Sequence, residues 1–204
     1  MRRYRSPEKM KHRLIEIILE RTFRFTDSPT FRLASGAMSS FYFNCKPTTL
    51  SPEGMYLIGS LMFDLMKKRK SWRVQGVGGL TLGADPVANA IAYTSYIKDE
   101  PVESFVVRKE PKKHGTMLWV EGNVKEGDRI IVIEDVVTTG GSAHKAIERA
   151  RMCGLQVQGV MVLIDRQEGG RETIESLGIP VEVLLTKDEI FEAYQRVNKK
   201  QRNF

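Results

Sequence analysis

The chain has 204 residues, of which 41% are hydrophobic, so it can bury one substantial core, and we predict a single domain over residues 1–204. No run of about 18 apolar residues could span a bilayer, and no apolar signal-peptide stretch follows the charged N-terminal residues, so we expect a cytoplasmic protein with no membrane partner. The formal net charge of +7 favours anionic partners without distinguishing nucleic acid from a phosphorylated small molecule, and two cysteines without CxxC spacing indicate neither a disulfide framework nor a zinc site.

The first third of the chain predicts two helices separated by a strand-rich segment. A Ser-Pro pair at 6–7 suits the N-cap and first turn of a helix, and apolar residues then recur at helical spacing. Over residues 23–46 this periodicity is lost while aromatic and hydroxyl residues become common, which predicts short strands joined by a turn. A second Ser-Pro pair at 51–52 begins a helix that we expect to continue to Met66.

From residue 74 onwards, short apolar runs alternate with helical patterns. We expect strands at 74–79, 104–109, 129–135, 157–165 and 181–186, helices at 85–96 and 142–153, and a last helix from Thr186, where Thr186 and Glu189 form a capping box. Strands that are buried on both faces are continuous apolar runs. The sequence therefore predicts an α/β fold with a largely parallel sheet.

The segment 131–142, IVIEDVVTTGGS, contains the most informative motif. Ligands of open α/β sheets bind beyond the carboxyl ends of the strands, and the strand predicted at 129–133 ends in Glu134 and Asp135. A loop of small and hydroxyl residues follows and leads into a helix, whose N-terminal N–H groups suit a phosphate. Carboxylates repel phosphate but accept hydrogen bonds from sugar hydroxyls, so the two parts together predict a ribose 5-phosphate site. Alternatively, the carboxylates cap a turn and the glycines only bend it.

The order of residues in this segment resembles the phosphoribosyl diphosphate signature of type I phosphoribosyltransferases, and it is neither a Walker A loop nor a GxGxxG turn. The resemblance implies that family's α/β fold, with a central mostly parallel sheet flanked by helices. It also implies a small hood, made of residues 20–47 and part of 166–186, over a core of residues 52–165. The residues that it assigns to phosphoribosyl diphosphate are Glu134, Asp135, Val136, Val137, Thr138, Thr139, Gly140, Gly141 and Ser142.

A second motif is the basic segment 108–116, RKEPKKHGT, which is too polar and too broken by proline and glycine for a regular element. It could be only a solvated charged loop. Clustered cations could instead stabilise the charge that grows on a diphosphate leaving group, and His114 could carry a proton near neutral pH.

The pattern Arg-Lys-Glu-x-Lys-x-His-Gly resembles the catalytic loop of orotate phosphoribosyltransferases. The resemblance implies a homodimer in which the loop 108–116 reaches the neighbouring site, and catalytic roles for Lys112, His114 and Asp135. The diphosphate-binding residues that it implies are Arg108, Lys109, Lys112 and His114.

Orotate binding is implied by two further resemblances. Residues 31–46 are similar to the segment that helps form the hood over the base in this family, and Arg166 follows the strand 157–165 where the family presents an orotate-binding arginine. A planar guanidinium can donate two parallel hydrogen bonds to the orotate carboxylate, with Thr138 as a second contact. The alternative for Arg166 is an ion pair with Asp165 or Glu168, which we expect less.

The chain departs from many family members at two positions. Ala34 and Leu82 stand where a lysine is common. Since no cation precedes the helix at 85–96, we expect backbone N–H groups of the loop 78–86 to bind the diphosphate.

The resemblance implies a pentosyltransferase that moves the 5-phosphoribosyl group from phosphoribosyl diphosphate to orotate, giving orotidine 5'-monophosphate and diphosphate in pyrimidine (UMP) synthesis. We expect Mg²⁺ to be required and to be held mainly by the substrate rather than by a protein metal site. Two alternatives remain open. One is a phosphoribosyltransferase for a purine or another base, and the other is a non-enzymatic regulator of the same fold that binds RNA or a nucleotide. The main reading includes no nucleic-acid partner.

Overall fold

The computed structural model describes residues 6–32, 36, 38–112 and 119–202. Its helices are α1 (Pro7–Arg21), α2 (Lys46–Thr49), α3 (Pro52–Lys68), α4 (Ala84–Ile97), α5 (Gly141–Met152), α6 (Gly170–Glu175) and α7 (Lys187–Arg202). Its strands are β1 (Phe23–Phe25), β2 (Phe31–Arg32), β3 (Met38–Ser39), β4 (Phe41–Phe43), β5 (Gly76–Leu80), β6 (Glu103–Val107), β7 (Val120–Gly122), β8 (Arg129–Val137), β9 (Gln156–Asp165) and β10 (Val181–Thr186).

The centre of the described chain is a six-stranded sheet with the order β10-β9-β8-β5-β6-β7. All neighbouring strands are parallel except β7, which pairs antiparallel with β6 at the edge. The α/β class and the mostly parallel sheet are therefore confirmed. The sequence analysis did not predict β7, because three residues are too few for a periodic pattern to stand out.

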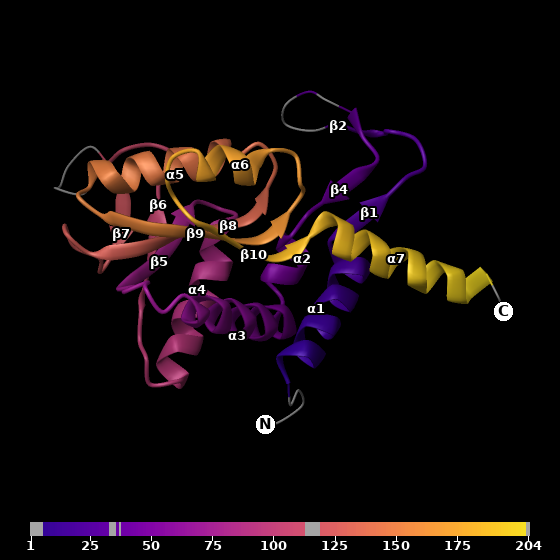
Figure 1. Cartoon of the computed structure of the whole chain (residues 1–204), viewed down its shortest axis with the longest axis horizontal. Coiled ribbons are helices and arrows are strands. Elements are labelled where there is room, and N and C mark those ends of the chain that lie inside the picture. The colour runs from indigo at the N-terminus through magenta and orange to yellow at the C-terminus, as the bar shows by residue number, and fades with distance from the viewer. Residues whose placement is uncertain (1–5, 33–35, 37, 113–118, 203–204) are drawn as a thin grey trace.

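Two helical layers cover the sheet, with α3 and α4 on one face and α5 and α6 on the other (Figure 1). Alternate residues of β8 supply the two cores. Ile131 and Ile133 pack with α1, α3 and α4, whereas Ile130 and Val132 pack with α5. Burial on both faces explains the continuous apolar run of this strand. None of the helices in the described ranges is long and apolar enough to cross a membrane.

The predicted helix starts are confirmed by their caps. The side chain of Ser6 accepts a hydrogen bond from the backbone N–H of Lys9 at 3.3 Å, and that of Ser51 accepts one from Gly54 at 3.1 Å. At α7 the capping box forms in both directions, with distances of 2.9 Å and 3.2 Å between Thr186 and Glu189. The short helices α2 and α6 were not predicted, because one turn carries little periodicity.

Outside the main sheet, β1 pairs with β4 and β2 pairs with β3, both antiparallel. An aromatic cluster holds the first pair against α7, with ring centroids 4.9 Å apart for Phe25 and Phe191 and 5.5 Å apart for Phe23 and Tyr194. Figure 1 shows this part projecting from the sheet beside α7. We expected part of 166–186 to complete the hood. Helix α7, which we had not assigned to it, packs directly on it.

Candidate functional site

Three parallel strands end at one edge of the sheet, and the segments that follow them lie together there. The carboxyl end of β8 is paired in register with that of β9, Val137 opposite Asp165, and the backbone N–H of Arg166 donates to Val137 at 3.0 Å. Strand β5 lies on the other side of β8. The loops after β5 and β8 and the residue after β9 are thus brought together, as the position of ligand sites in open α/β sheets predicts.

The acidic pair lies within β8, which continues to Val137. We expected the strand 129–135 to end with these carboxylates, whereas it continues beyond them, and the alternative that they cap a turn was wrong. Glu134 is buried, and one of its carboxylate oxygens has no hydrogen-bond partner in the described chain. Burial, and then the charge of Asp135, raise the pKa of Glu134 to about 8. Burial also raises the pKa of Asp135, while its hydrogen bond from the N–H of Val136 and the charge of Lys46 act against this.

The loop after β5 packs closely against Asp135. A β-carbon on Gly83 would overlap the carboxylate of Asp135, although the φ of −74° and ψ of −47° at this position suit any residue. A side chain here would therefore displace the carboxylate of Asp135, whereas the backbone conformation sets no such limit. In the same loop the hydroxyl of Thr81 donates to Asp85 at 2.8 Å, and the other carboxylate oxygen of Asp85 is buried without a partner in the described chain. The side chain of Leu82 points into solvent, 67% exposed.

The loop after β8 ends at the N-terminus of α5. Gly140 has a φ of +83°, a conformation that favours glycine, and no side chain of the described chain caps the helix at this end. The first N–H groups of α5 are thus left for another acceptor. Gly170, at the start of α6, lies against this loop so closely that a β-carbon would be 2.8 Å from the nitrogen of Gly140. The sequence analysis missed both Gly83 and Gly170, because their role comes from contacts between distant segments.

Arg166 is buried beneath the hood strands. Its guanidinium donates to the hydroxyl of Ser39 at 3.3 Å and to the carbonyl of Phe41 at 3.4 Å, and it lies 5.7 Å from the ring centroid of Phe43. It also forms an ion pair with Glu168 at 2.8 Å. We expected this ion pair less than a role in ligand binding, but it is present. The Nε atom of Arg166 is buried and has no partner in the described chain.

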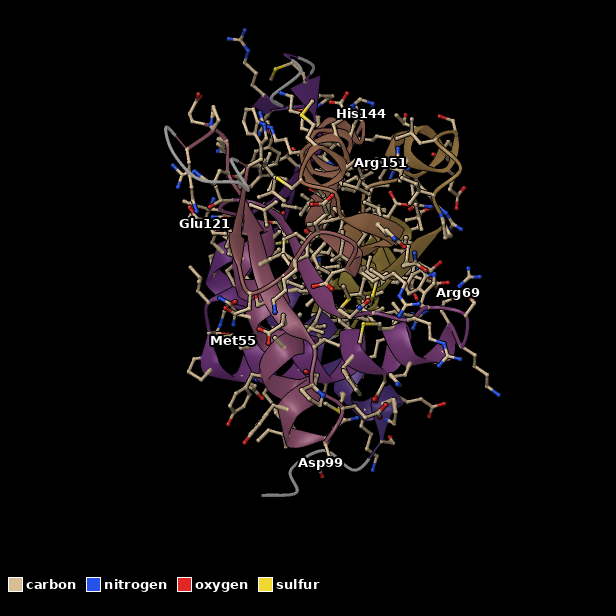
Figure 2. The ribbon with its side chains drawn as sticks, turned by 90° about the vertical axis from the view of Figure 1, so that its left-hand side faces the viewer. Met55, Arg69, Asp99, Glu121, His144 and Arg151 are labelled. Carbon is tan, nitrogen blue, oxygen red and sulfur yellow. The ribbon has the colours of Figure 1, made fainter. Side chains whose placement is uncertain are left out.

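The basic segment leaves the sheet at the end of β6. Arg108 and Lys112 both bind Glu121 of β7, at 3.0 Å and 2.5 Å. Hydrogen bonds from these two cations lower the pKa of Glu121, that from Lys112 most. Figure 2 places Glu121 at the edge of the sheet. Lys109 is exposed. His114 and Ala34 lie outside the described residues.

The described residues contain no group of three or more His, Cys, Asp and Glu side chains that is arranged to hold a metal ion. Among the carboxylates of the site, Asp135 and Asp85 lie close enough to influence each other electrostatically. Any metal there would need most of its ligands from a bound molecule.

The chain is similar to known phosphoribosyltransferases in sequence and in fold. The model of the phosphoribosyl transferase domain matches residues 60–190. The orotate phosphoribosyltransferase of Aquifex aeolicus (strain VF5) is 47% identical, covering 88% of this chain and 97% of the relative. The crystal structure of Mycobacterium tuberculosis orotate phosphoribosyltransferase in complex with Fe(III) dicitrate superposes with a TM-score of 0.77 at 35% identity. The structure of the same protein with 5-phospho-α-D-ribosyl 1-diphosphate gives a TM-score of 0.73 at 33% identity, and each comparison covers 89% of this chain and 98% of the other.

Proposed function

The chain belongs to the orotate phosphoribosyltransferase family, and from this premise we propose how its residues transfer the 5-phosphoribosyl group from phosphoribosyl diphosphate to N1 of orotate. The products are orotidine 5'-monophosphate and diphosphate. One observation carries the proposal. The N-terminus of α5, the carboxylate of Asp135 and the guanidinium of Arg166 lie at a single edge of the sheet, where a phosphate, a ribose and an anionic base can be bound together.

The donor's 5'-phosphate occupies the N-terminus of α5. The loop from Thr138 to Ser142 contributes its hydroxyls and its N–H groups, and the helix dipole adds a partial positive charge. A β-carbon on Gly141 would meet nothing within 4 Å, so there is open space for the phosphate at this point. Packing of Gly170 against the loop fixes its shape before the ligand arrives.

The ribose lies on the acidic pair. Asp135 is half-buried between the loop after β5 and Lys46, so it accepts the ribose hydroxyls and stabilises the positive charge that develops at the anomeric carbon. The unpartnered oxygen of Glu134 is a second acceptor. Diphosphate is held by the backbone N–H groups after Thr81 and by the cations Arg108, Lys109, Lys112 and His114. The N–H of Thr81 itself is excluded, since it donates to Val107 within the fold.

Gly83 offers a test of this arrangement. Gly83→Ala should lower kcat/KM for phosphoribosyl diphosphate by about 10²-fold, because the new methyl group displaces the carboxylate of Asp135 from the ribose. Steady-state kinetics with each substrate varied in turn measure the effect. Gly127→Ala, in a turn before β8, serves as the control, since it strains a backbone with φ of +89° without a contact near the site. Wild-type kinetics for Gly83→Ala would contradict the assigned position of the ribose.

Orotate binds under the hood with its carboxylate on Arg166. The Nε atom of Arg166 is unpartnered, and a terminal nitrogen of its guanidinium is paired with Glu168. The orotate carboxylate therefore accepts one hydrogen bond from Nε and a second from the terminal nitrogen, where it replaces Glu168. The ring of Phe43 near the guanidinium and the bonds to Ser39 and Phe41 keep it oriented. Thr138, next to Val137, contacts the base from the other side.

Mg²⁺ fits this donor set only as a substrate-bound ion. Its preferred ligands are oxygens with several retained waters, and the diphosphate and ribose hydroxyls supply them. Asp135 and the unpartnered oxygen of Asp85 are the protein groups that would hold its waters. When bound, the ion neutralises charge on the departing diphosphate.

A homodimer completes the proposal. Helices α3 and α4 expose apolar side chains that include Met55, Tyr93 (70% exposed), Tyr96 (72%) and Ile97 (62%), and a cavity of about 460 Å³ lies between them. Figure 2 shows Met55 pointing away from the molecule on this face. Exposed patches of this kind mark interfaces, and α4 begins next to the loop that packs on Asp135. In the proposed dimer, the 108–116 segment of each subunit serves the site of the other.

Ile97→Glu combined with Tyr93→Glu should therefore convert the dimer to a monomer and reduce activity, because two buried charges without partners oppose association. Sedimentation equilibrium and the orotate assay report the two effects. Met152→Glu, which changes an equally exposed apolar residue on α5, should alter neither. A dimer that survives the double substitution would exclude this surface.

The orotate assay distinguishes the proposed function from its rivals. Loss of orotate absorbance is followed with phosphoribosyl diphosphate and Mg²⁺, and adenine and hypoxanthine are offered separately. Turnover of a purine without orotate consumption would indicate a phosphoribosyltransferase for another base. Turnover of no base would favour a nucleotide-binding regulator of the same fold. Location in the cytoplasm stays a prediction.

A further inference from the structure

Arg149 of α5 contacts both ends of the segment that includes the basic cations. Its Nη1 donates to the carbonyl of Arg108 at 2.8 Å, where the segment leaves β6, and its guanidinium lies 4.4 Å from the ring centroid of Trp119, where the chain returns to β7. The N–H of Arg108 donates to the carbonyl of Trp119 at 2.9 Å. The two ends are therefore hydrogen-bonded to each other, and Arg149 is hydrogen-bonded to Arg108 and stacks on Trp119.

We call Arg108 and Trp119, the two ends of the basic segment, its root. The cations of the segment, among them Arg108 and Lys112, are the proposed diphosphate ligands. The guanidinium of Arg108 binds the carboxylate of Glu121, which lies two residues after Trp119, and Lys112 binds the same carboxylate. Glu121 pairs with both cations, so the two side chains converge on one anionic group. The orientation of these cations depends on where the root is held.

Helix α5 connects this root to the phosphate loop. Gly141 begins the helix at the proposed 5'-phosphate site, and Arg149 lies eight residues later, roughly 12 Å along the helix axis. Ala143, Ala146, Ile147 and Ala150 are buried against the sheet, so the helix is fixed on its inner face. A rigid element thus fixes the root of the basic segment relative to the sheet.

We propose that Arg149 is a positioning residue for phosphoribosyl transfer: by holding Arg108 and Trp119 against α5, it aims Arg108 and Lys112 at the diphosphate. The inference rests on the proposed function of the basic segment. Arg149 does not touch the substrate. A residue that only stabilised the fold would have no preference between the two substrates, whereas this role affects the donor alone.

Arg149→Met tests the inference, because methionine keeps an unbranched side chain and removes the hydrogen bond and the charge. We expect KM for phosphoribosyl diphosphate to rise about tenfold, kcat to fall several-fold, and KM for orotate to stay as in the wild type. Arg149→Lys keeps a cation over Trp119 and should recover part of the loss. The matched control is Arg151→Ala, two residues later on the same helix, where the side chain is exposed; Figure 2 shows it on α5.

Trp119→Leu provides an independent variant that removes the ring and leaves Arg149 intact, and it should raise KM for the donor in the same direction. The inference is overturned if Arg149→Met lowers the melting temperature but leaves donor KM unchanged, or if it raises KM for both substrates equally. Should the wild type consume no orotate, the proposed function fails rather than this inference. In that case, calorimetric titration with phosphoribosyl diphosphate and Mg²⁺ tests the role of Arg149. Arg149→Met should still bind the donor about tenfold more weakly than Arg151→Ala.

Discussion

Replacing Lys112 with alanine should lower kcat for orotidine 5'-monophosphate formation by about 10³-fold, the largest loss that we expect from a single substitution. Negative charge grows on the diphosphate as the glycosidic C–O bond breaks, and a cation placed for that charge acts more strongly in the transition state than in the ground state. Lys112 has such a charge partner in Glu121, at 2.5 Å, which shows that its side chain reaches an anion at this edge of the sheet. Pre-steady-state measurement of a single turnover separates this loss from product release.

Lys125→Ala is the control for the overall charge of the chain, since Lys125 is exposed in the turn before β8, away from the basic segment. It should keep wild-type kinetics. If Lys112→Ala retained more than about a tenth of wild-type kcat, the lysine would not be stabilising the leaving group. A loss confined to KM would assign it to ground-state binding instead.

The same variant tests whether sites are shared between subunits. Mixing Lys112→Ala chains with Asp135→Ala chains should restore part of the activity if the 108–116 segment of one subunit serves the neighbouring site, because a mixed dimer then has one site with both residues intact. No rescue, with mixed dimers shown to form, would confine each segment to its own site.

Glu134→Gln should make the protein more stable and less active, and the gain in stability should grow with pH. Burial raises the pKa of Glu134 to about 8 in the folded state from an ordinary value of 4.5. Between these values the unfolded chain has released the proton that the folded chain keeps, so the free energy of unfolding falls as pH rises, by at most about 1.4 kcal/mol per pH unit from this group. The contribution of Glu134 to the free energy of unfolding is fully present below pH 4.5 and is lost as the pH rises through 8.

Glutamine has no charge to bury, so Glu134→Gln removes this part of the slope. At pH 8 the variant should exceed the wild type by on the order of 3–5 kcal/mol, and at pH 5 the two should lie close together. Denaturant unfolding at pH 5, 6.5 and 8, at one protein concentration, measures the difference, with Glu172→Gln on the exposed side of α6 as control. Parallel pH profiles for wild type and Glu134→Gln would show that Glu134 ionises normally. The fall in kcat is expected near and above pH 8, where the wild-type carboxyl is ionised and a neutral amide cannot replace its charge beside the ribose.

Much of the fold followed from local patterns in the sequence. The Ser-Pro starts of α1 and α3 and the capping box of α7 are confirmed, because a cap depends only on residues within one turn. The strands of the parallel sheet were found because burial on both faces leaves continuous apolar runs. The end of β8 was placed too early: its acidic residues look like a strand end, although the backbone pairing continues beneath them to Val137.

The site, too, could be predicted from the sequence only in part. The donor motif 131–142 could be recognised because its acidic pair and its phosphate loop are contiguous in the chain. Arg149, Glu121, Gly83 and Gly170 could not be assigned, because each acts on a segment that is distant in sequence: Arg108, Lys112, Asp135 and the loop at Gly140. A single sequence contains no signal for such contacts.

By itself, then, the sequence determined the class of fold, the donor motif and the family resemblance, because these depend on residue type and on spacing along the chain. Only the tertiary structure decided that Glu134 is buried with an unpartnered oxygen, that Arg166 is paired with Glu168 beneath the hood, and that α5 connects the phosphate loop to the root of the basic segment. Burial, charge and distance in a site are set by the elements that pack around it, and those elements come from all parts of the chain.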